Sequence, residues 1–471
     1  MGKSTGFLEY ERVENAGQEP LERIKTYREF HTPLSEEDRR KQGARCMDCG
    51  VPFCQAGKPI FGMVSGCPLN NLCPEWNDMV YNGFWDEAAD RLLLTNCFPE
   101  FTSRVCPALC EKACTCGLYG DPVTVKENEY AIIEHAFSTG YIHANPPKVR
   151  TGKRVAVVGS GPSGLTCAGD LAKLGYDVTV FEALHELGGV LVYGIPEFRL
   201  PKQKVVAKVK ELGVKFETNV VIGKSTTIDQ LMEEEGFEAV FIGSGAGLPM
   251  FMGIPGENAN EVFSANEYLT RSNLMKAFRD DYDTPIAAGK KVAVVGGGNV
   301  AMDAARTALR LGAEVHVVYR RSEAELPARA EEVHHAKEEG IIFDLLTNPK
   351  KINVDENGNI TSMTVIKMEL GEPDASGRRR PVEIEGSEYD IEVDTVIMSL
   401  GTSPNPLISS TTKGLETNRR KCIVAEEENG QTSKEGVFAG GDAVTGAATV
   451  ILAMGAGKAG AKGIDEYLRN K

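Results

Sequence analysis

The chain has 471 residues, of which 42% are hydrophobic and 25% are charged, and its formal net charge is −15. This length predicts two or three domains with buried cores. The excess of acidic residues disfavours nucleic acids and anionic membranes as partners, because both would repel the chain. The first residues lack the apolar stretch of a signal peptide, and no run of 18 apolar residues occurs, so we expect a cytoplasmic protein without a transmembrane helix.

The first part of the chain is rich in cysteine: ten of the twelve cysteines lie between Cys46 and Cys116. Without a secretory signal, such a density favours metal ligation over a disulfide framework. The spacing C-x2-C-x4-C, then C-P, then C-P-x2-C-x3-C-x-C is neither a ferredoxin run nor a paired zinc ribbon, and zinc stays open as an alternative to iron. Short helical periodicities and few β-branched runs predict a mainly α-helical domain, which ends at a linker over residues 144–148.

A first strand–turn–helix unit follows the linker. The run 154–158 predicts a buried parallel strand, residues 159–164 form a G-x-G-x-x-G turn, and a second strand over 177–181 ends at an acidic residue. Glycines at these positions allow a tight turn, close approach of a pyrophosphate and helix–strand packing, and the acid can bind ribose hydroxyls. The residues predicted to bind this first dinucleotide are Gly159, Gly161, Pro162, Ser163, Gly164, Glu182 and Gly189.

The same unit recurs with strands predicted over 291–295 and 314–318, so the sequence predicts two Rossmann-like domains. Here the turn reads G-x-G-x-x-A, and two arginines replace the acid at the end of the second strand. Arginines bind a 2′-phosphate that an acid would repel, which favours NADPH over NADH. The residues predicted to bind this second dinucleotide are Gly296, Gly298, Asn299, Val300, Ala301, Arg320 and Arg321.

The segment 432–442 resembles the second flavin motif of the two-dinucleotide-binding flavoprotein family, which makes FAD the expected first dinucleotide. The resemblance implies flavin contacts from Gly441, Asp442 and Val450, and a helix from about 447 to 453 whose N-terminus points at the flavin. Segments 239–245 and 395–401 look like this family's crossovers between its two domains. No C-x-x-C lies near either dinucleotide motif, which argues against a disulfide reductase of the thioredoxin reductase type.

These features together predict an α/β fold in which an NADPH domain is inserted into an FAD domain, preceded by a helical iron–sulfur domain. The predicted boundaries are 1–148 for the iron–sulfur domain, 149–270 for the first FAD segment, 271–401 for the NADPH domain and 402–471 for the second FAD segment.

Over nearly its whole length the sequence resembles the small (β) subunit family of NADPH-dependent glutamate synthase, and its first half resembles dihydropyrimidine dehydrogenase. The resemblance implies two [4Fe–4S] clusters with interleaved ligands. One cluster would be held by Cys46, Cys49, Cys54 and Cys114, and the other by Cys67, Cys106, Cys110 and Glu129. Cys73, Cys97 and Cys116 then have no ligand role and are expected to be packed thiols.

The resemblance further implies that electrons pass from NADPH through FAD and the clusters to a large (alpha) subunit, which makes L-glutamate from L-glutamine and 2-oxoglutarate. An N-terminal cysteine nucleophile and a barrel for FMN are not found in the sequence, so the acceptor is expected to be another protein. A subunit of a ferredoxin-coupled transhydrogenase, a subunit of a pyrimidine-reducing complex, and a cluster-bearing scaffold or sensor share the same motifs and remain alternatives.

Overall fold

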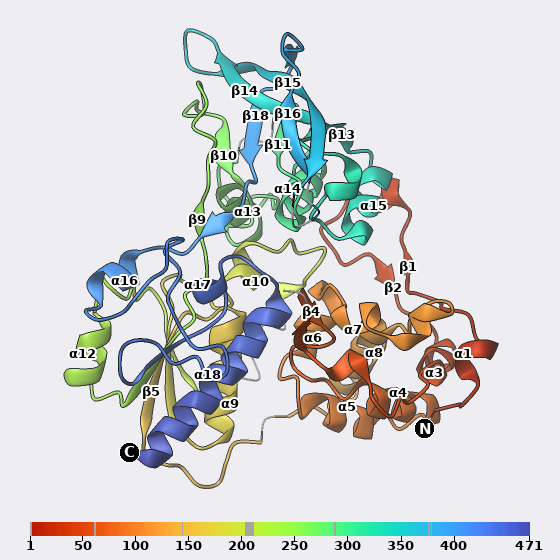
Figure 1. The fold of residues 1–471 in the computed structure, drawn as a ribbon, viewed down its shortest axis with the longest axis vertical. Helices are drawn as coiled ribbons and strands as arrows, with labels where there is room; N and C mark the ends of the chain where they lie inside the picture. The colour runs from red at the N-terminus through yellow and green to blue at the C-terminus, as the bar shows by residue number, and fades with distance from the viewer. Residues whose placement is uncertain are drawn as a thin grey trace.

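The structure is a computed structural model that describes residues 2–60, 63–143, 145–202, 212–286, 289–374, 377 and 379–471; residue 144 of the predicted linker lies outside them. Figure 1 shows a helical N-terminal part beside one parallel sheet, with a second parallel sheet above both. This arrangement confirms the predicted fold class. No helix in the described ranges is long and apolar enough to cross a membrane.

The N-terminal part is built from short helices and loops. Amphipathic spacing accounts for α5, because its Trp85, Ala88, Ala89 and Leu92 recur every three or four residues and are all buried. The helices are α1 (Gly6–Glu9), α2 (Pro20–Arg23), α3 (Glu36–Ala44), α4 (Cys73–Asn82), α5 (Trp85–Leu93), α6 (Pro99–Val105), α7 (Leu109–Lys112) and α8 (Val125–Ser138), with 3₁₀ turns η1 (Phe53–Gln55) and η2 (Thr115–Leu118). Two short antiparallel pairs join β1 (Ala16–Gly17) to β2 (His31–Thr32) and β3 (Lys58–Ile60) to β4 (Met63–Ser65).

The first parallel sheet has the strand order β20 (Val437–Ala439), β8 (Ala239–Ile242), β5 (Arg154–Val158), β6 (Asp177–Phe181) and β7 (Lys215–Glu217). Alternate residues of β5 face opposite sides. Val155 and Val157 pack in one core with α9 (Pro162–Lys173) and α18 (Val450–Asn470), while Ala156 and Val158 pack in another with α12 (Ile228–Glu233). Coverage of both faces fits the almost continuous apolar sequences of the three adjacent strands β20, β8 and β5.

The second parallel sheet has the order β10 (Val262–Ser264), β18 (Thr395–Met398), β11 (Lys291–Val295), β12 (Glu314–Tyr319) and β13 (Ile342–Leu345). Helices α13 (Ala265–Asn273) and α14 (Asn299–Arg310) pack in the same core, and α15 (Ala330–Glu338) adds Val333 and Ala336 to it. An antiparallel sheet of β14 (Thr347–Val354), β15 (Ile360–Pro373), β16 (Arg379–Glu383) and β17 (Tyr389–Ile391) covers the other face.

Two connecting segments pass between the sheets side by side. Strand β9 (Leu248–Pro249) pairs antiparallel with β19 (Thr402–Ser403), as expected for crossovers into and out of an inserted domain. Strand β10, inside the segment predicted as FAD domain, pairs with β18 of the second sheet. We therefore propose that the inserted domain begins at β9 rather than at residue 271, which keeps each sheet within one domain.

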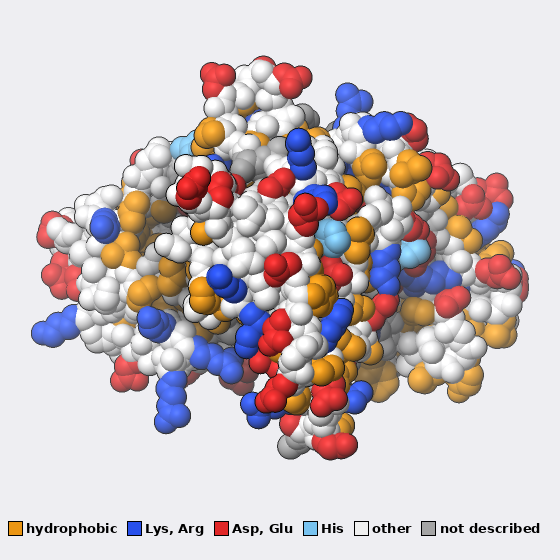
Figure 2. All heavy atoms as spheres, turned by 90° about the horizontal axis from the view of Figure 1, so that it is seen from above, with side chains coloured by type: hydrophobic (Ala, Val, Ile, Leu, Met, Phe, Trp, Pro, Cys, Tyr) orange, Lys and Arg blue, Asp and Glu red, His pale blue; other side chains and the backbone are white. Residues whose placement is uncertain are grey.

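Figure 2 views the molecule from the side of the second sheet. On this face acidic and basic side chains are interspersed, with small hydrophobic groups between them.

Candidate cofactor sites

The first glycine loop connects β5 to α9. Gly159 has a φ of +98°, and a Cβ there would lie 2.6 Å from the carbonyl oxygen of Gly243. A Cβ on Gly164 would overlap the carbonyl oxygen of Gly159, so the helix packs directly on the strand. Gly161 is the N-cap of α9, Pro162 takes the first helical position, and a Cβ on Gly161 would meet only open space. The loop therefore presents bare backbone and a helix N-terminus to an approaching anion.

Glu182 lies at the end of β6 and is buried beside this loop. Its Oε2 accepts hydrogen bonds from the backbone N–H and the hydroxyl of Ser160 at 2.9 and 2.5 Å, and its Oε1 accepts one from the N–H of Leu184. Gly189 has a φ of +54°, and a Cβ there would lie 3.0 Å from Cα of Gly161. The structure thus brings the predicted strand-end acid and the predicted glycine into contact with the loop.

The C-terminal motif lies at the same edge of the sheet. A Cβ on Gly441 would lie 2.9 Å from Oγ of Ser163, which places this glycine against the start of α9. Burial raises the pKa of Asp442 to about 6, and Oδ1 of Asp442 accepts a hydrogen bond from the N–H of Ala448. The final helix begins at Val450 with Thr449 as its N-cap, three residues later than predicted from the motif. The hydroxyl of Thr449 accepts a hydrogen bond from the N–H of Leu452, and this cap sets the true start of the helix.

The second glycine loop connects β11 to α14. Gly296 has a φ of +138°, and a Cβ there would overlap the carbonyl oxygen of Ser399 at the end of β18. Gly298 is the N-cap of α14, and a Cβ on it would meet only open space. Ala301 is fully buried, whereas the side chain of Val300 is exposed. This loop repeats the geometry of the first one, with alanine at the third glycine position.

Arginines follow the second strand of this unit. Arg320 is exposed, and Nε of Arg321 is buried without a hydrogen-bond partner among the described residues. Sequence inspection missed Arg329, whose backbone N–H donates to Oδ1 of Asn299 at 2.9 Å. Nη1 of Arg329 is also buried without a hydrogen-bond partner in the described part of the chain. The guanidinium of Arg329 also pairs with Glu331 and Glu332, so of these two arginines Arg321 is the one that fits a phosphate-bearing ligand beside the helix N-terminus.

The cysteines of the N-terminal part form two neighbouring sets. In the first set, burial raises the pKa of the Cys46 thiol, and the nearby Cys49, Cys54 and Cys114 raise it further. In the second, burial raises the pKa of the Cys106 thiol, and the nearby Cys110, Glu129 and Cys67 raise it further. All twelve cysteines are free thiols, and burial raises the pKa of Cys46 and Cys67 to about 12. Reduced thiols in two sets of this kind fit the donor sets of iron–sulfur clusters, whose iron binds cysteine as thiolate.

Glu129 lies on α8 and is only 5% exposed. Its Oε1 accepts hydrogen bonds from Oγ1 of Thr102 and from Nδ2 of Asn96. Burial raises the pKa of its carboxyl group to about 8. Glu129 is thus a buried carboxyl group beside Cys67, Cys106 and Cys110.

The three cysteines without a predicted ligand role are all buried. Cys73 contacts Cys54 of the first set and Cys110 of the second, so it lies between the two sets. Cys97 donates to Oγ1 of Thr166 in α9 at 3.6 Å. The thiol of Cys116 donates to the carbonyl oxygen of Arg45, and its contact with Cys114 lowers the pKa of Cys114 to about 6.

The second cysteine set lies against the first parallel domain. Pro68 follows Cys67, and a Cβ on Gly455 of α18 would lie 3.4 Å from the carbonyl oxygen of Pro68. Nearby, Nζ of Lys458 donates to the carbonyl oxygen of Thr95 at 2.9 Å. The first set is more exposed than the second, because Cys46, Cys49, Cys54 and Cys114 are half-buried while Cys67, Cys106 and Cys110 are buried.

Comparisons with known proteins also divide the chain into an N-terminal cysteine-rich part and a dinucleotide-binding part. Residues 120–236 and 153–457 match the family described as pyridine nucleotide-disulphide oxidoreductase, and residues 23–141 match dihydropyrimidine dehydrogenase domain II, 4Fe-4S cluster. The glutamate synthase [NADPH] small chain of Bacillus subtilis is 39% identical over 99% of both chains. The chain belongs to the glutamate synthase small-chain family. The Escherichia coli small chain is 35% identical over 98% of both chains, and the E. coli putative oxidoreductase AegA is 37% identical over 93% of this chain and 67% of its own.

Solved structures show the same fold for the dinucleotide-binding part. Mycobacterium tuberculosis FprA in complex with NADPH has a TM-score of 0.55 and 20% identity, over 68% of this chain and 85% of that one. Lactococcus lactis thioredoxin reductase has a TM-score of 0.50 and 20% identity, over 68% of this chain and all of that one. Family membership makes the chain an oxidoreductase that uses FAD, a nicotinamide dinucleotide and 4Fe–4S clusters.

Proposed function

We propose that the chain is the NADPH-oxidising, electron-input subunit of a glutamate synthase. Its acceptor is a large (alpha) subunit that makes L-glutamate from L-glutamine and 2-oxoglutarate, and the complex acts in the cytoplasm. Relatives with this name are 35–39% identical over nearly the whole chain. One observation carries the proposal. The buried cysteine set packs through Pro68 on helix α18, and this helix begins beside the first glycine loop.

FAD supplies the conversion of a two-electron hydride from NADPH into single electrons, which iron–sulfur clusters accept. The chain's own residues position the two dinucleotides. Gly159, Gly161 and the N-terminus of α9 would hold the pyrophosphate of FAD, and the carboxylate of Glu182 would accept hydrogen bonds from its ribose hydroxyls. Asp442 and the start of α18 at Val450 lie on the flavin side of this site.

At the second site, Gly296, Gly298 and the N-terminus of α14 hold the pyrophosphate of NADPH. Arg320 and Arg321 bind the 2′-phosphate, since β12 ends in Tyr319 rather than an acid. The side-chain oxygen of Asn299 already accepts a hydrogen bond from the backbone N–H of Arg329, so it is not free to bind this ligand.

The two cysteine sets would hold the two clusters with the ligands that the family resemblance implies, including Glu129 for the second. The buried set then lies next to the flavin domain, and the half-exposed set lies next to solvent. Clusters bound there would supply one-electron transfer, with the buried set placed toward the first parallel domain and the half-exposed set placed toward a partner protein.

Apolar side chains are exposed around the half-exposed set. Sγ of Cys49 lies 3.2 Å from Oγ1 of Thr115, which joins the loops that carry η1 and η2. On these loops Val51, Phe53, Leu118 and Tyr119 are exposed, the last two by 76% and 87%. Large apolar side chains grouped on a surface are typical of protein contacts, and we assign this surface, residues 51–53 and 118–119, to the large subunit.

The proposal is tested by adding NADPH anaerobically to the purified chain and recording the flavin absorbance. Rapid bleaching is expected, with slower or weaker bleaching by NADH. Absence of bleaching would favour a cluster-bearing scaffold or sensor instead. Purification of the untagged native complex then distinguishes a glutamate synthase large subunit from a ferredoxin-linked or pyrimidine-reducing partner.

A further inference from the structure

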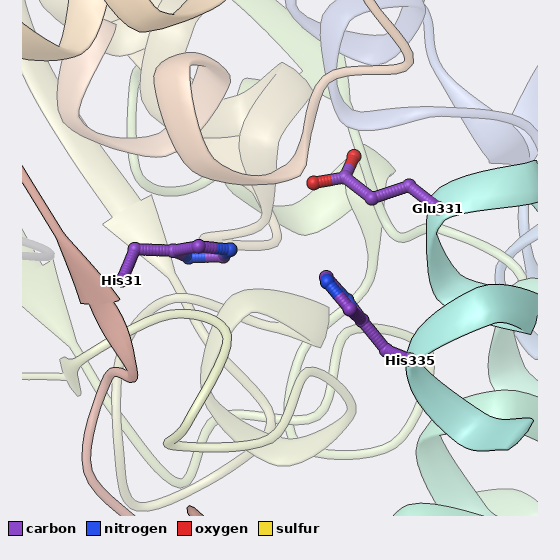
Figure 3. Close-up of side chains that lie close together, drawn as sticks. All are labelled: His31, Glu331 and His335. Atoms are coloured by element: carbon purple, nitrogen blue, oxygen red, sulfur yellow. The ribbon is translucent and has the colours of Figure 1, made fainter. Parts of the chain in front are cut away.

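Two histidines and a glutamate meet where the N-terminal segment crosses the NADPH domain. Figure 3 shows His31, on β2, and Glu331 and His335, one helical turn apart on α15, directed toward a common centre. One potential ligand atom from each residue lies within 4.8 Å of the other two. The cluster thus joins segments about 300 positions apart in the sequence.

The surroundings leave room for an ion. The three residues line a cavity of about 50 Å³, larger than a single water needs. Nδ1 of His335 is buried and has no hydrogen-bond partner in the described part of the chain, so no hydrogen bond fixes the ring in one tautomer. Phe30 and His31 both pack against the ring of His335, with centroids at 5.2 and 5.8 Å, and hold it in place.

The carboxylate of Glu331 is already paired on one side. Nζ of Lys126 lies 3.2 Å from Oε2 of Glu331, and the guanidinium of Arg329 contacts the same oxygen. The hydrogen bonds from Lys126 and Arg329 both go to Oε2, and no hydrogen bond to Oε1 occurs among the described residues. A cation at the centre would therefore bind Oε1 and would compete with the charge of Lys126.

We propose that His31, Glu331 and His335 form a binding site for a divalent first-row metal ion of the zinc class. Two imidazoles and one carboxylate form a donor set that such ions prefer, and water completes the coordination. The site lies apart from the cysteine sets and serves to fasten the N-terminal segment to α15.

This position links the metal to the second dinucleotide site. Helix α15 begins after Arg329, whose N–H is bonded to Asn299 in the glycine loop. The N-terminal segment also contacts this helix through Arg23, whose Nε donates to Glu339 at 2.7 Å. An ion at the site would add a further contact between the N-terminal part of the chain and the second parallel domain, beside the ion pairs of Arg23 and Lys126.

The test is equilibrium dialysis of the cluster-loaded protein against zinc, with zinc and iron measured together. One zinc per chain is expected at unchanged iron content. His31→Ala and His335→Ala should each weaken zinc binding at least tenfold. His334→Ala is the matched control, because His334 is on the same helix with a side chain that is 69% exposed, and it should bind zinc as the parent does.

A second experiment removes the positive charge of Lys126, which would compete with the metal ion for Glu331. Lys126→Met should raise the affinity for zinc, and unchanged or weaker affinity would argue against Glu331 as a ligand and so against the site. Failure of the parent protein to retain zinc would also overturn the proposal. So would zinc uptake that matches a loss of iron, or that persists when both His31 and His335 are replaced.

Discussion

Arg320 and Arg321 follow β12 at the position where an NAD site carries an acid. Each charge-assisted contact to a phosphate is worth roughly 1.5–3 kcal/mol. Arg320→Glu together with Arg321→Ala should therefore lower the affinity for NADPH more than tenfold and shift preference toward NADH, measured from steady-state kinetics with both nucleotides. Arg379→Glu with Arg380→Ala makes the same change on exposed β16 and should have little effect. Unchanged NADPH kinetics in the first variant would remove these arginines from the site.

Glu129 lies beside the buried cysteine set with its pKa raised by burial. Replacement by alanine should lower the iron content or alter the EPR signal of one cluster, while FAD occupancy stays normal. Glu134→Ala, on the same helix but paired with Arg104, is the control and should keep full iron. Full iron and an unaltered EPR spectrum in Glu129→Ala would contradict a ligand role.

Site residues that belong to a local sequence pattern could be predicted from the sequence, and site residues brought together from distant segments could not. The glycines at 159, 164 and 296 lie where a Cβ would collide with backbone atoms. Only glycine is tolerated there, so their spacing can be recognised in the sequence. His31, Glu331 and Arg329 have no such pattern, because their neighbours come from distant segments. The division of the cysteines into two sets came from family resemblance, since a spacing rule does not say which thiols meet in space.

At the scale of elements, strands with both faces buried were predicted well. The strands over 154–158, 177–181 and 291–295 have the expected bounds, because a continuous apolar run between turn residues admits few alternatives. The antiparallel strands β14–β17 were not predicted, since their half-exposed faces give a weaker pattern. Strand β10 has only three residues, and its partner β18 lies more than 130 positions away.

The loops that carry η1 and η2 offer a prediction at this scale. Leu118→Asp together with Tyr119→Asp should weaken binding to the large subunit at least tenfold, because two charges replace apolar contacts. NADPH-dependent dye reduction should not change. The paired control is Val382→Asp with Ile384→Asp, two exposed apolar residues on or just after β16, and it should bind normally. Equal binding by both variants in a pull-down titration would place the contact surface elsewhere.

At the scale of the molecule, the helical N-terminal part contacts both parallel-sheet domains. The buried cysteine set packs on the first parallel domain, the half-exposed set is partly open to solvent, and the N-terminal segment reaches across to α15. On the proposed function, dye reduction needs only the two dinucleotide sites, whereas electron transfer to a partner also needs the cysteine-rich domain. The two activities should therefore separate.

The most direct measurement is NADPH-dependent glutamate formation from glutamine and 2-oxoglutarate, with dye reduction followed in parallel. The chain alone should reduce the dye and form no glutamate, and adding the large subunit should restore glutamate formation. Cys67→Ser or Cys106→Ser should abolish glutamate formation by the pair, yet leave dye reduction in protein that retains its FAD. Glutamate formation by the chain alone, or normal activity of the pair without its clusters, would contradict the electron-relay account.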